Sequence, residues 1–319
     1  MRRWIPGFGA GKPLAQVGTG AAVIGVALIC AVLGTNIAPY HPLRYNPRET
    51  LQAPTWAHLL GTDPLGRDVL SQIMGGARIS MVVGVLSVVA GMLAGTMIGL
   101  VAGTLRGRGS DLLMRTMDAL LVFPSLILAL AITAFLGVSL WNVIAALAVT
   151  FVPTFAILVR GEVLSLRERD FVAAARSLGN GSGRIMWRHL LPNVSDVLLV
   201  QSSFGVGTAI LTEASLSFLG LGVPPPALSW GRMLREGYSY LLLAPWISIA
   251  SGAAIFLVVL AFQMLSDGLR DVLGRPARPS EAAGPAGPLR KLGGVIGRIT
   301  RVGESRPAPT GTSHSYVTT

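Results

Sequence analysis

The sequence is poor in charged residues, and this scarcity is the first constraint on what the protein can be. Asp, Glu, Lys and Arg make up 13% of the 319 residues, whereas a soluble domain carries about a quarter. Apolar residues make up 51%, and the mean hydropathy is +0.61. This balance excludes an ordinary soluble domain and favours a protein that lies in a membrane.

Cysteine and metal-binding patterns are also nearly absent. Cys30 is the only cysteine and lies within an apolar run, so the chain cannot form an internal disulfide or a cysteine metal cluster. We expect Cys30 to be a small packed residue in a helix. The four histidines lack the spacing of a metal site, and no G-x-S-x-G turn occurs. We therefore expect no resident metal and no enzymatic activity.

Lysine is scarce too, which bears on nucleotide binding. A Walker A loop needs a lysine followed by serine or threonine. The two lysines are Lys12, which precedes Pro13, and Lys291, which precedes Leu292. Any ATPase that drives this chain must therefore be another polypeptide. The formal net charge is +11, but no basic patch with interleaved aromatic residues occurs, so we expect no nucleic-acid partner.

Apolar runs of about 20 residues are abundant, and this length crosses a hydrocarbon core of about 30 Å. We predict an all-α membrane protein with six transmembrane helices. The first run is too long for a typical signal peptide and further spans follow it, so we interpret it as an uncleaved anchor. The predicted spans are residues 17–38, 79–103, 118–137, 140–159, 194–219 and 246–265.

The positive charges predict how these spans are oriented. With the N-terminus inside, 20 Lys and Arg residues fall on the inner side and six on the outer side, and inner loops of membrane proteins carry such an excess. We therefore expect both termini in the cytoplasm and Trp141, Trp230 and Trp246 at the outer interface. The predicted organisation is a cytoplasmic N-terminus at 1–16, an outer segment at 39–78, a five-helix core at 79–267 with a basic loop at 104–117 and a cytoplasmic loop at 161–193, and a largely disordered cytoplasmic tail at 268–319.

The second span carries a glycine at every fourth position. Such small residues form a strip along one helix face and let another helix approach closely. We predict a tight helix–helix seam and leave open whether it also moves. Proline is expected to kink the third and fourth spans. The glycines are Gly91, Gly95, Gly99 and Gly103, and the prolines are Pro124 and Pro153.

The longest polar interruption within the apolar part of the chain is residues 161–193. Its five arginines exclude a membrane span, yet four apolar residues follow the i, i+3, i+4, i+7 spacing of one helix face. Asp170 stands at the expected N-cap and Gly179 at the expected C′ position. The residues of this face are Phe171, Ala174, Ala175 and Leu178.

A second short helix is predicted at residues 184–190, after a glycine-rich run. Ser182 is the expected cap, and Pro192 is expected to end the helix. Two short helices between membrane spans form a compact knob at the membrane surface. Such a knob suits docking into another protein.

The segment resembles the EAA loop of bacterial ABC importer permeases, in which E-A-A is followed by three residues, a glycine and a spacer that ends in L-P. Ala173 stands in place of the glutamate, which is a departure from the motif. In that family the loop is a coupling helix that inserts into a groove on a separate ATPase subunit. The coupling residues implied here are Phe171, Ala174, Ala175, Leu178, Gly179, Arg184, Leu191 and Pro192.

Two further segments resemble the second permease subunit of dipeptide and oligopeptide ABC importers. The outer one reads LGTDPLGRD at residues 60–68 and GARIS at 76–80, and the other reads EASLSFLGLGVPP at 213–225. Together the three signatures occur in order and cover roughly residues 58 to 230. The charged and glycine residues of the outer signature are Asp63, Gly66, Arg67 and Asp68.

The resemblance implies a type I ABC importer permease in the bacterial cytoplasmic (inner) membrane. Such a subunit pairs with a homologous permease chain in a heterodimer and encloses the translocation path. Two ATPase subunits, which hold ATP and Mg, dock from the cytoplasm, and an external binding protein delivers di- or oligopeptides. The family also includes importers of nickel and glutathione, and nothing in this sequence selects the substrate.

Several roles stay open at the level of sequence. Glu213 is the one charge well inside a predicted span, and it is either a gate or pathway residue or a carboxylate with a local partner. Asp63, Arg67 and Asp68 either form ion pairs that hold the outer segment, which we favour, or contact the binding protein. A self-contained channel or secondary carrier is the alternative function, and a non-transporting scaffold is a third.

Overall fold

The structure, a computed structural model, describes residues 13–105 and 107–273. Within these ranges the regular structure is helical, apart from one isolated bridge between Thr62 and Asp68. The all-α prediction is therefore confirmed, whereas the predicted disordered tail lies almost wholly outside the described residues. The helices are α1 (Pro13–Ile37), η1 (Pro47–Glu49), α2 (Val69–Thr104), α3 (Arg108–Leu121), α4 (Ser125–Leu136), α5 (Leu140–Arg167), α6 (Asp170–Ser177), α7 (Ser182–Ile185), η2 (Met186–Leu190, a π-turn), α8 (Leu191–Phe218), α9 (Trp230–Tyr238) and α10 (Pro245–Leu273).

Five helical stretches of the described residues are long and apolar enough to cross a membrane: α1, α2, α5, the continuous run Ser182–Phe218, and α10. The pair α3 and α4 makes a sixth crossing only if it counts as one span, and it bends by 91°. The kink predicted at Pro124 in the span 118–137 is therefore confirmed and is sharper than an ordinary helix kink, whereas most of the loop predicted at 104–117 is helix α3. The bend lies at Pro124, which precedes α4 and favours an extended residue before it.

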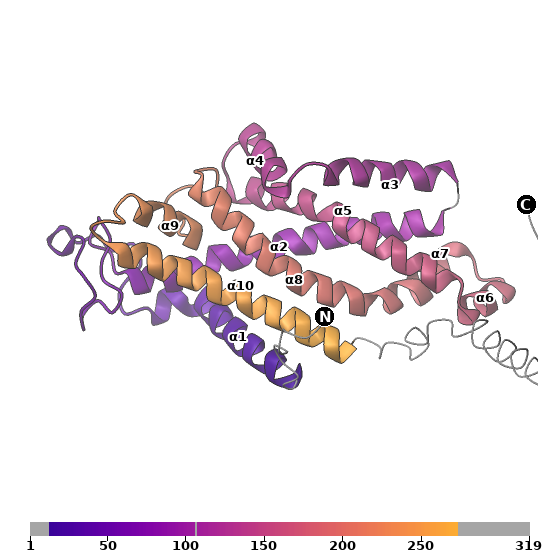
Figure 1. Cartoon of the computed structure of the whole chain (residues 1–319), viewed down its shortest axis with the longest axis horizontal. Coiled ribbons are helices and arrows are strands. Elements are labelled where there is room, and N and C mark those ends of the chain that lie inside the picture. The colour runs from indigo at the N-terminus through magenta and orange to yellow at the C-terminus, as the bar shows by residue number, and fades with distance from the viewer. Residues whose placement is uncertain (1–12, 106, 274–319) are drawn as a thin grey trace, which may run out of the picture. The chain divides into compact units, whose positions relative to one another are not determined.

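The most extensive helix contact joins α2 and α5, which lie side by side along the glycine strip (Figure 1). A Cβ atom on Gly95 would lie 2.5 Å from the carbonyl oxygen of Val152, and one on Gly99 would lie 2.6 Å from that of Ala156. The other two glycines approach α5 in the same way. The predicted seam is therefore present, and any side chain on this strip would push the two helices apart.

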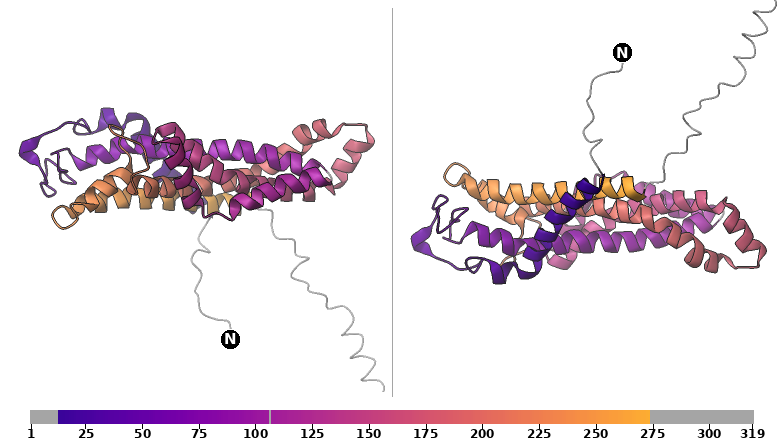
Figure 2. Two further views of the ribbon diagram at one scale, coloured as in Figure 1. Left: turned by 90° about the horizontal axis from the view of Figure 1, so that it is seen from above. Right: turned by 90° about the horizontal axis from the view of Figure 1, so that it is seen from below.

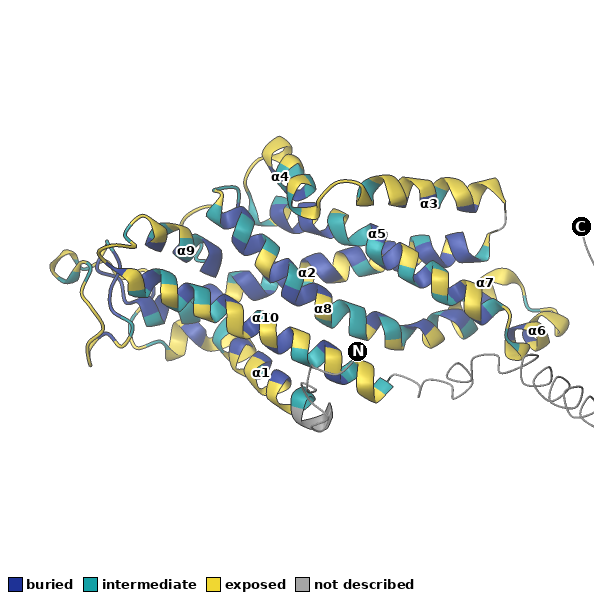
Figure 3. Cartoon of the chain, viewed as in Figure 1, coloured by how far each residue is buried: buried dark blue, intermediate teal, exposed yellow. Residues whose placement is uncertain are grey.

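The remaining spans surround this pair. Helix α8 contacts both α2 and α10, and α1 lies against α10 and α2 (Figure 2). Coloured by exposure, α1 is mostly exposed whereas α2 is largely buried (Figure 3). The exposed side chains of α1 include Val26, Ile29 and Val32. An apolar exposed face of this kind suits a helix surrounded by lipid.

Three helix boundaries differ from the prediction, and one of them is the end of α10, which continues to Leu273 rather than ending near 265, so the first residues of the predicted tail are helical. The other two differ for one physical reason. Helix α2 begins at Val69 rather than at residue 79, and α5 continues to Arg167 rather than ending near 159. Both added helical stretches contain polar residues, so a search for apolar runs does not include them in the predicted spans. In α2 these residues are Ser71 and Gln72, which are buried against the outer segment. The non-helical outer part is therefore shorter than the predicted 39–78.

Pro192 does not end a helix, contrary to the prediction. It lies in the first turn of α8, where its missing N–H is not needed. The preceding turn is a π-turn, in which the Leu191 N–H donates to the Met186 carbonyl five residues earlier. A proline ring normally clashes with the carbonyl four residues before it. The wider turn relieves this clash, so α7, η2 and α8 form one continuous path.

The seam yields a stability prediction. We expect Gly95→Val to lower the free energy of unfolding by about 1–3 kcal/mol, because overpacking a tight contact has that effect. The measurement is the thermal unfolding midpoint of the purified protein in detergent. Gly161→Val, on α5, is the matched control because no heavy atom lies within 4 Å of its Cβ position. Equal midpoints for both variants would contradict a tight seam.

Candidate functional site

Helix α6 forms where the apolar pattern predicts it, although its first turn differs in detail. Asp170 begins the helix instead of capping it, and its negative charge is favourable in the first turn. At the other end Gly179 has φ +77°, and its N–H donates to the Arg176 carbonyl at 2.9 Å. The Asn180 N–H donates to the Ala175 carbonyl at 3.2 Å. This is a Schellman-type end, which favours glycine because the backbone is left-handed there.

The apolar residues of α6 point in two directions. Val172 and Ala175 are buried in the main hydrophobic core, together with Val163 and Leu166 of α5. The other three residues of the predicted face are exposed, and Leu178 is 83% exposed. Ala175 thus packs against the core of this chain, whereas the other three residues of the predicted face form an exposed strip that points away from the core. We call this strip the apolar strip of α6: Phe171, Ala174 and Leu178.

Helix α6 is held between two rigid helices. Only two residues separate it from α5, and the Arg167 guanidinium of α5 donates to the Gly103 carbonyl at 2.5 Å. This bond ties the end of α5 to the end of α2. On the other side α7 leads directly into α8, and Ile185 and Leu190 are buried in the same core as Ala175. A displacement of α6 would therefore move α5 and α8 with it.

The structure places the other residues of the loop motif around this core. Arg184 is exposed, with its guanidinium 3.4 Å from the Asn180 side-chain oxygen. Leu191 packs against the core and Pro192 is exposed. Ala173, which replaces the motif glutamate, is also exposed. The predicted cap Ser182 instead starts α7 and caps nothing.

The outer signature forms a buried network of charges at the opposite end of the spans. Asp63 accepts from Arg67 Nε at 2.5 Å and from the Gln72 side chain at 2.9 Å. The same guanidinium donates to Glu236 of α9 at 3.1 Å. Asp63 and Arg67 are only 2% and 8% exposed. Both side chains thus have their partners within this chain, and Glu236 was not identifiable from sequence because it lies 169 residues away.

Asp68 serves a second part of the network. Its carboxylate accepts from the Ser71 N–H at 2.8 Å and so caps α2, and it bonds to His58 Nδ1 at 3.0 Å. Gly66 has φ +68°, and a side chain there would collide with the Asn46 carbonyl. The histidine is buried beside a carboxylate, and no regular spacing in the sequence predicts this pair.

Three tryptophans are predicted at the outer interface: Trp141 is 68% exposed, whereas Trp230 and Trp246 bond within the outer end. Trp230 is 3% exposed, and its Nε1 donates to the Ile73 carbonyl at 2.9 Å. Trp246 donates to the Thr62 carbonyl at 3.1 Å. These bonds connect α9 and α10 to the outer segment and to α2. The outer segment is therefore fastened to the bundle at several points.

Glu213 lies inside α8 and is fully buried. Its Oε1 accepts from Ser217 Oγ at 2.6 Å, and that hydroxyl lies 3.3 Å from Ser229 Oγ of α9. Within the described part of the chain, Oε2 has no hydrogen-bond partner. The geometry therefore supplies a local partner for one oxygen only. It connects Glu213 to the junction of α8 and α9.

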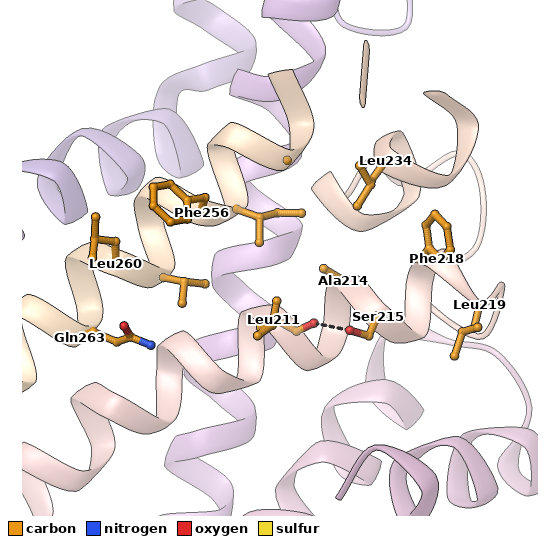
Figure 4. A pocket seen from close by; sticks show the side chains of 12 residues that line it. Leu211, Ala214, Ser215, Phe218, Leu219, Leu234, Phe256, Leu260 and Gln263 are labelled. Atoms are coloured by element: carbon orange, nitrogen blue, oxygen red, sulfur yellow. Dashed lines mark hydrogen bonds between the residues drawn. The ribbon is translucent and has the colours of Figure 1, made fainter. Parts of the chain in front are cut away.

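An apolar groove of about 690 Å³, which the sequence did not suggest, runs between α8 and α10 (Figure 4). Ser215 and Gln263 are its only polar side chains, and Ser215 bonds to the Leu211 carbonyl at 2.9 Å. Such a lining accepts apolar groups and carries no group for catalysis. Among the described residues no cluster of His, Cys, Asp or Glu could hold a metal ion.

Comparisons with known proteins agree with this geometry. Residues 95–278 match the family described as "Binding-protein-dependent transport system inner membrane component". The chain is 44% identical over 260 residues to the dipeptide transport system permease protein DppC of Alkalihalophilus pseudofirmus, covering 79% of this chain and 84% of that protein. It is 43% identical over 256 residues to the glutathione transport system permease protein GsiD of Pectobacterium atrosepticum, covering 79% and 85%. It is 42% identical over 252 residues to the di/tripeptide transport system permease protein DppC of Pseudomonas aeruginosa, covering 77% and 83%.

The outer network yields a second stability prediction. We expect Arg67→Ala to destabilise the protein by about 3–5 kcal/mol, because it leaves the buried Asp63 carboxylate without its cation. Arg44→Ala is the control, since Arg44 is exposed in the same outer segment. Thermal unfolding midpoints of the two variants give the comparison. A midpoint for Arg67→Ala close to that of Arg44→Ala would mean that the ion pair contributes little.

Proposed function

The chain belongs to the family of binding-protein-dependent transport system inner membrane components, and from this premise we propose that it is a permease subunit of an ATP-driven importer of di- or oligopeptides. In this proposal it encloses the translocation path together with a homologous permease chain. Two ATPase subunits dock below the permease pair from the cytoplasm, and residues 161–193 of this chain insert into a groove on an ATPase subunit. An external binding protein delivers the peptide to the opposite end.

The observation that carries the coupling assignment is the apolar strip of α6. The strip presents Phe171 and Leu178 together on one exposed helix face, and neighbouring exposed apolar side chains of this kind favour a protein partner that covers them. The helix is short, well capped by Gly179 and fastened to α5 and α8. A partner that grips α6 thus pulls on two membrane spans at once. This is the mechanical link that an ATPase on a separate chain requires.

The proposed source of energy follows from the sequence. The two lysines do not form a Walker A loop, so ATP and Mg are assigned to the partner subunits. A carrier driven by protons or ions keeps ionisable groups within its spans. The central parts of α1, α2, α5 and α10 carry none, and Glu213 is the single carboxylate in the apolar part of α8. Helix α3 is the exception, with Arg115 and Asp118 in its second half. The preference for an externally powered path over a secondary carrier therefore rests on the family match as well as on the scarcity of charge in the other spans.

The proposed substrate class rests on the named relatives, which transport dipeptides, di/tripeptides or glutathione. Each of these is a small peptide. We assign the finer choice among them to the binding protein and the partner permease. Glu213 and the outer signature then serve to hold α8, α9 and the outer segment in place near the entrance.

The coupling assignment predicts the effect of a single substitution. We expect Leu178→Asp to abolish peptide uptake and to release the ATPase subunits, because a charge replaces the most exposed apolar group of the strip. Leu178→Met keeps the apolar contact and should retain uptake. The measurements are uptake by cells and the amount of each variant in the membrane fraction. Normal uptake by Leu178→Asp at normal abundance would refute the coupling role of α6.

The whole proposal is tested by purifying the tagged chain in mild detergent and identifying what accompanies it. The expected result is one homologous permease chain and two ATPase subunits, with peptide uptake restored when the complex and its binding protein are placed in vesicles. Recovery of the chain alone, active in liposomes without ATP, would replace the proposal by a self-contained channel or carrier.

A further inference from the structure

Helix α3 carries a stripe of charged residues whose signs alternate. Arg108, Asp111, Arg115 and Asp118 are spaced at i, i+3, i+7 and i+10, so they share one face of the helix. All four are exposed, while Met114 and Met117 are buried. Within the described residues the only ion pair of the stripe is a long one, 4.0 Å between Asp111 and Arg160. We call these four residues the charged stripe of α3.

The buried residues of α3 contact α5, and these contacts show at which depth along α5 the charged stripe lies. Met114 and Met117 form one buried cluster with Ala156 of α5, and Val152 packs against that cluster. Helix α5 has 28 residues and is therefore about 42 Å long. Val152 and Ala156 lie about 18 and 24 Å from its outer end. A hydrocarbon layer of about 30 Å contains both positions wherever α5 is placed along the membrane normal.

Arg115 and Asp118 are sequence neighbours of these two methionines, so they lie at nearly the same depth, on the exposed part of α3. An arginine side chain is long enough to extend toward a distant surface, but an aspartate is too short. Ionised side chains at this depth are costly in lipid and normally face a water-filled cavity or a partner. By contrast, the exposed residues of the peripheral helix α1 at mid-membrane depth, such as Val26, are apolar.

From this placement we propose that the charged stripe of α3 lines a water-filled path and offers ion-pair partners to a zwitterionic peptide. The alternating signs present a cation and an anion within one helical turn of each other. A free peptide carries an ammonium group at one end and a carboxylate at the other, so each end finds a partner along the stripe. The path itself follows from the depth of Asp118, and the choice of ligand rests on the proposed function.

The stripe also explains why α3 and α4 bend apart. Helix α4 is almost wholly apolar, whereas α3 is amphipathic. If α3 and α4 formed one straight helix, the same face of that helix would be charged along α3 and apolar along α4, and the two parts would need different surroundings. The 91° bend at Pro124 separates them. One half is then free to face water while the other faces an apolar environment.

The path is tested by reaction of single cysteines with a charged, membrane-impermeant methanethiosulfonate in the assembled complex. Cys30→Ser first removes the only native cysteine. We expect Asp118→Cys in this background to react at least about tenfold faster than Val26→Cys, because a thiolate forms readily in water and not in lipid. Val26 is the control since it is 62% exposed on the outer helix α1. Equally slow reaction of the two variants would overturn the proposal. It would also be overturned if the Asp118→Cys variant crosslinks to the partner permease and does not react with the reagent, because residue 118 would then face protein instead of water.

The ligand is tested with the assembled complex placed in vesicles, in the same Cys30→Ser background. An excess of a free dipeptide should slow the labelling of Ala119→Cys, an exposed neutral position beside the intact stripe, at least about twofold. The same dipeptide with an acetylated N-terminus and an amidated C-terminus should not slow it, because only the free form pairs with both signs. Equal effects of the two peptides would overturn the zwitterion assignment. Asp118→Glu should retain uptake that Asp118→Asn loses. Absence of peptide uptake by the wild-type complex would instead refute the proposed function, and the labelling result would still decide whether the path exists.

Discussion

Close contact between α2 and α5 holds the remainder of the chain in place. In a bilayer, apolar side chains gain little by exchanging lipid for another helix, so helix association depends on dense packing. The glycine strip provides this packing, since a Cβ at Gly95 or Gly99 would meet backbone oxygens of α5. Arg167 closes the inner end of the same pair by donating to the Gly103 carbonyl. Because α6 begins three residues after Arg167, its position relative to the spans depends on this helix pair.

The outer end is held by a different interaction. Buried charges are tolerated only with partners, and removal of one partner leaves the other uncompensated. Asp63 and Arg67 of the outer segment and Glu236 of α9 meet this condition across two distant parts of the chain, and Asp68 meets it with His58 while it caps α2. The segment before α2 is therefore folded onto the bundle without helices of its own beyond one short turn. Tryptophan bonds from α9 and α10 secure it further.

Two surfaces of the described chain are not completed by the chain itself. The apolar strip of α6 faces away from the core, and the charged stripe of α3 is exposed, with one ion pair of 4.0 Å among the described residues; the proposed placement of α3 puts Asp118 of this stripe at membrane depth. One is apolar where water would be expected, and the other is charged where lipid would be expected. Both conflicts are resolved if the chain is part of a larger assembly, with a protein partner at the first surface and an aqueous path at the second.

Several features follow from the sequence alone, because they depend on local pattern. Long apolar runs determine the helices that cross the membrane, the four-residue glycine period determines the α2–α5 seam, and Gly179 marks the end of α6. Other features depend on residues far apart in the chain. No local rule pairs Arg67 with Glu236, turns Ala175 inward while Leu178 faces out, or places α3 beside the middle of α5. Hydropathy cannot detect the polar ends of α2 and α5, because tertiary contacts rather than composition stabilise those ends. Pro124 did indicate the bend between α3 and α4, but not its angle.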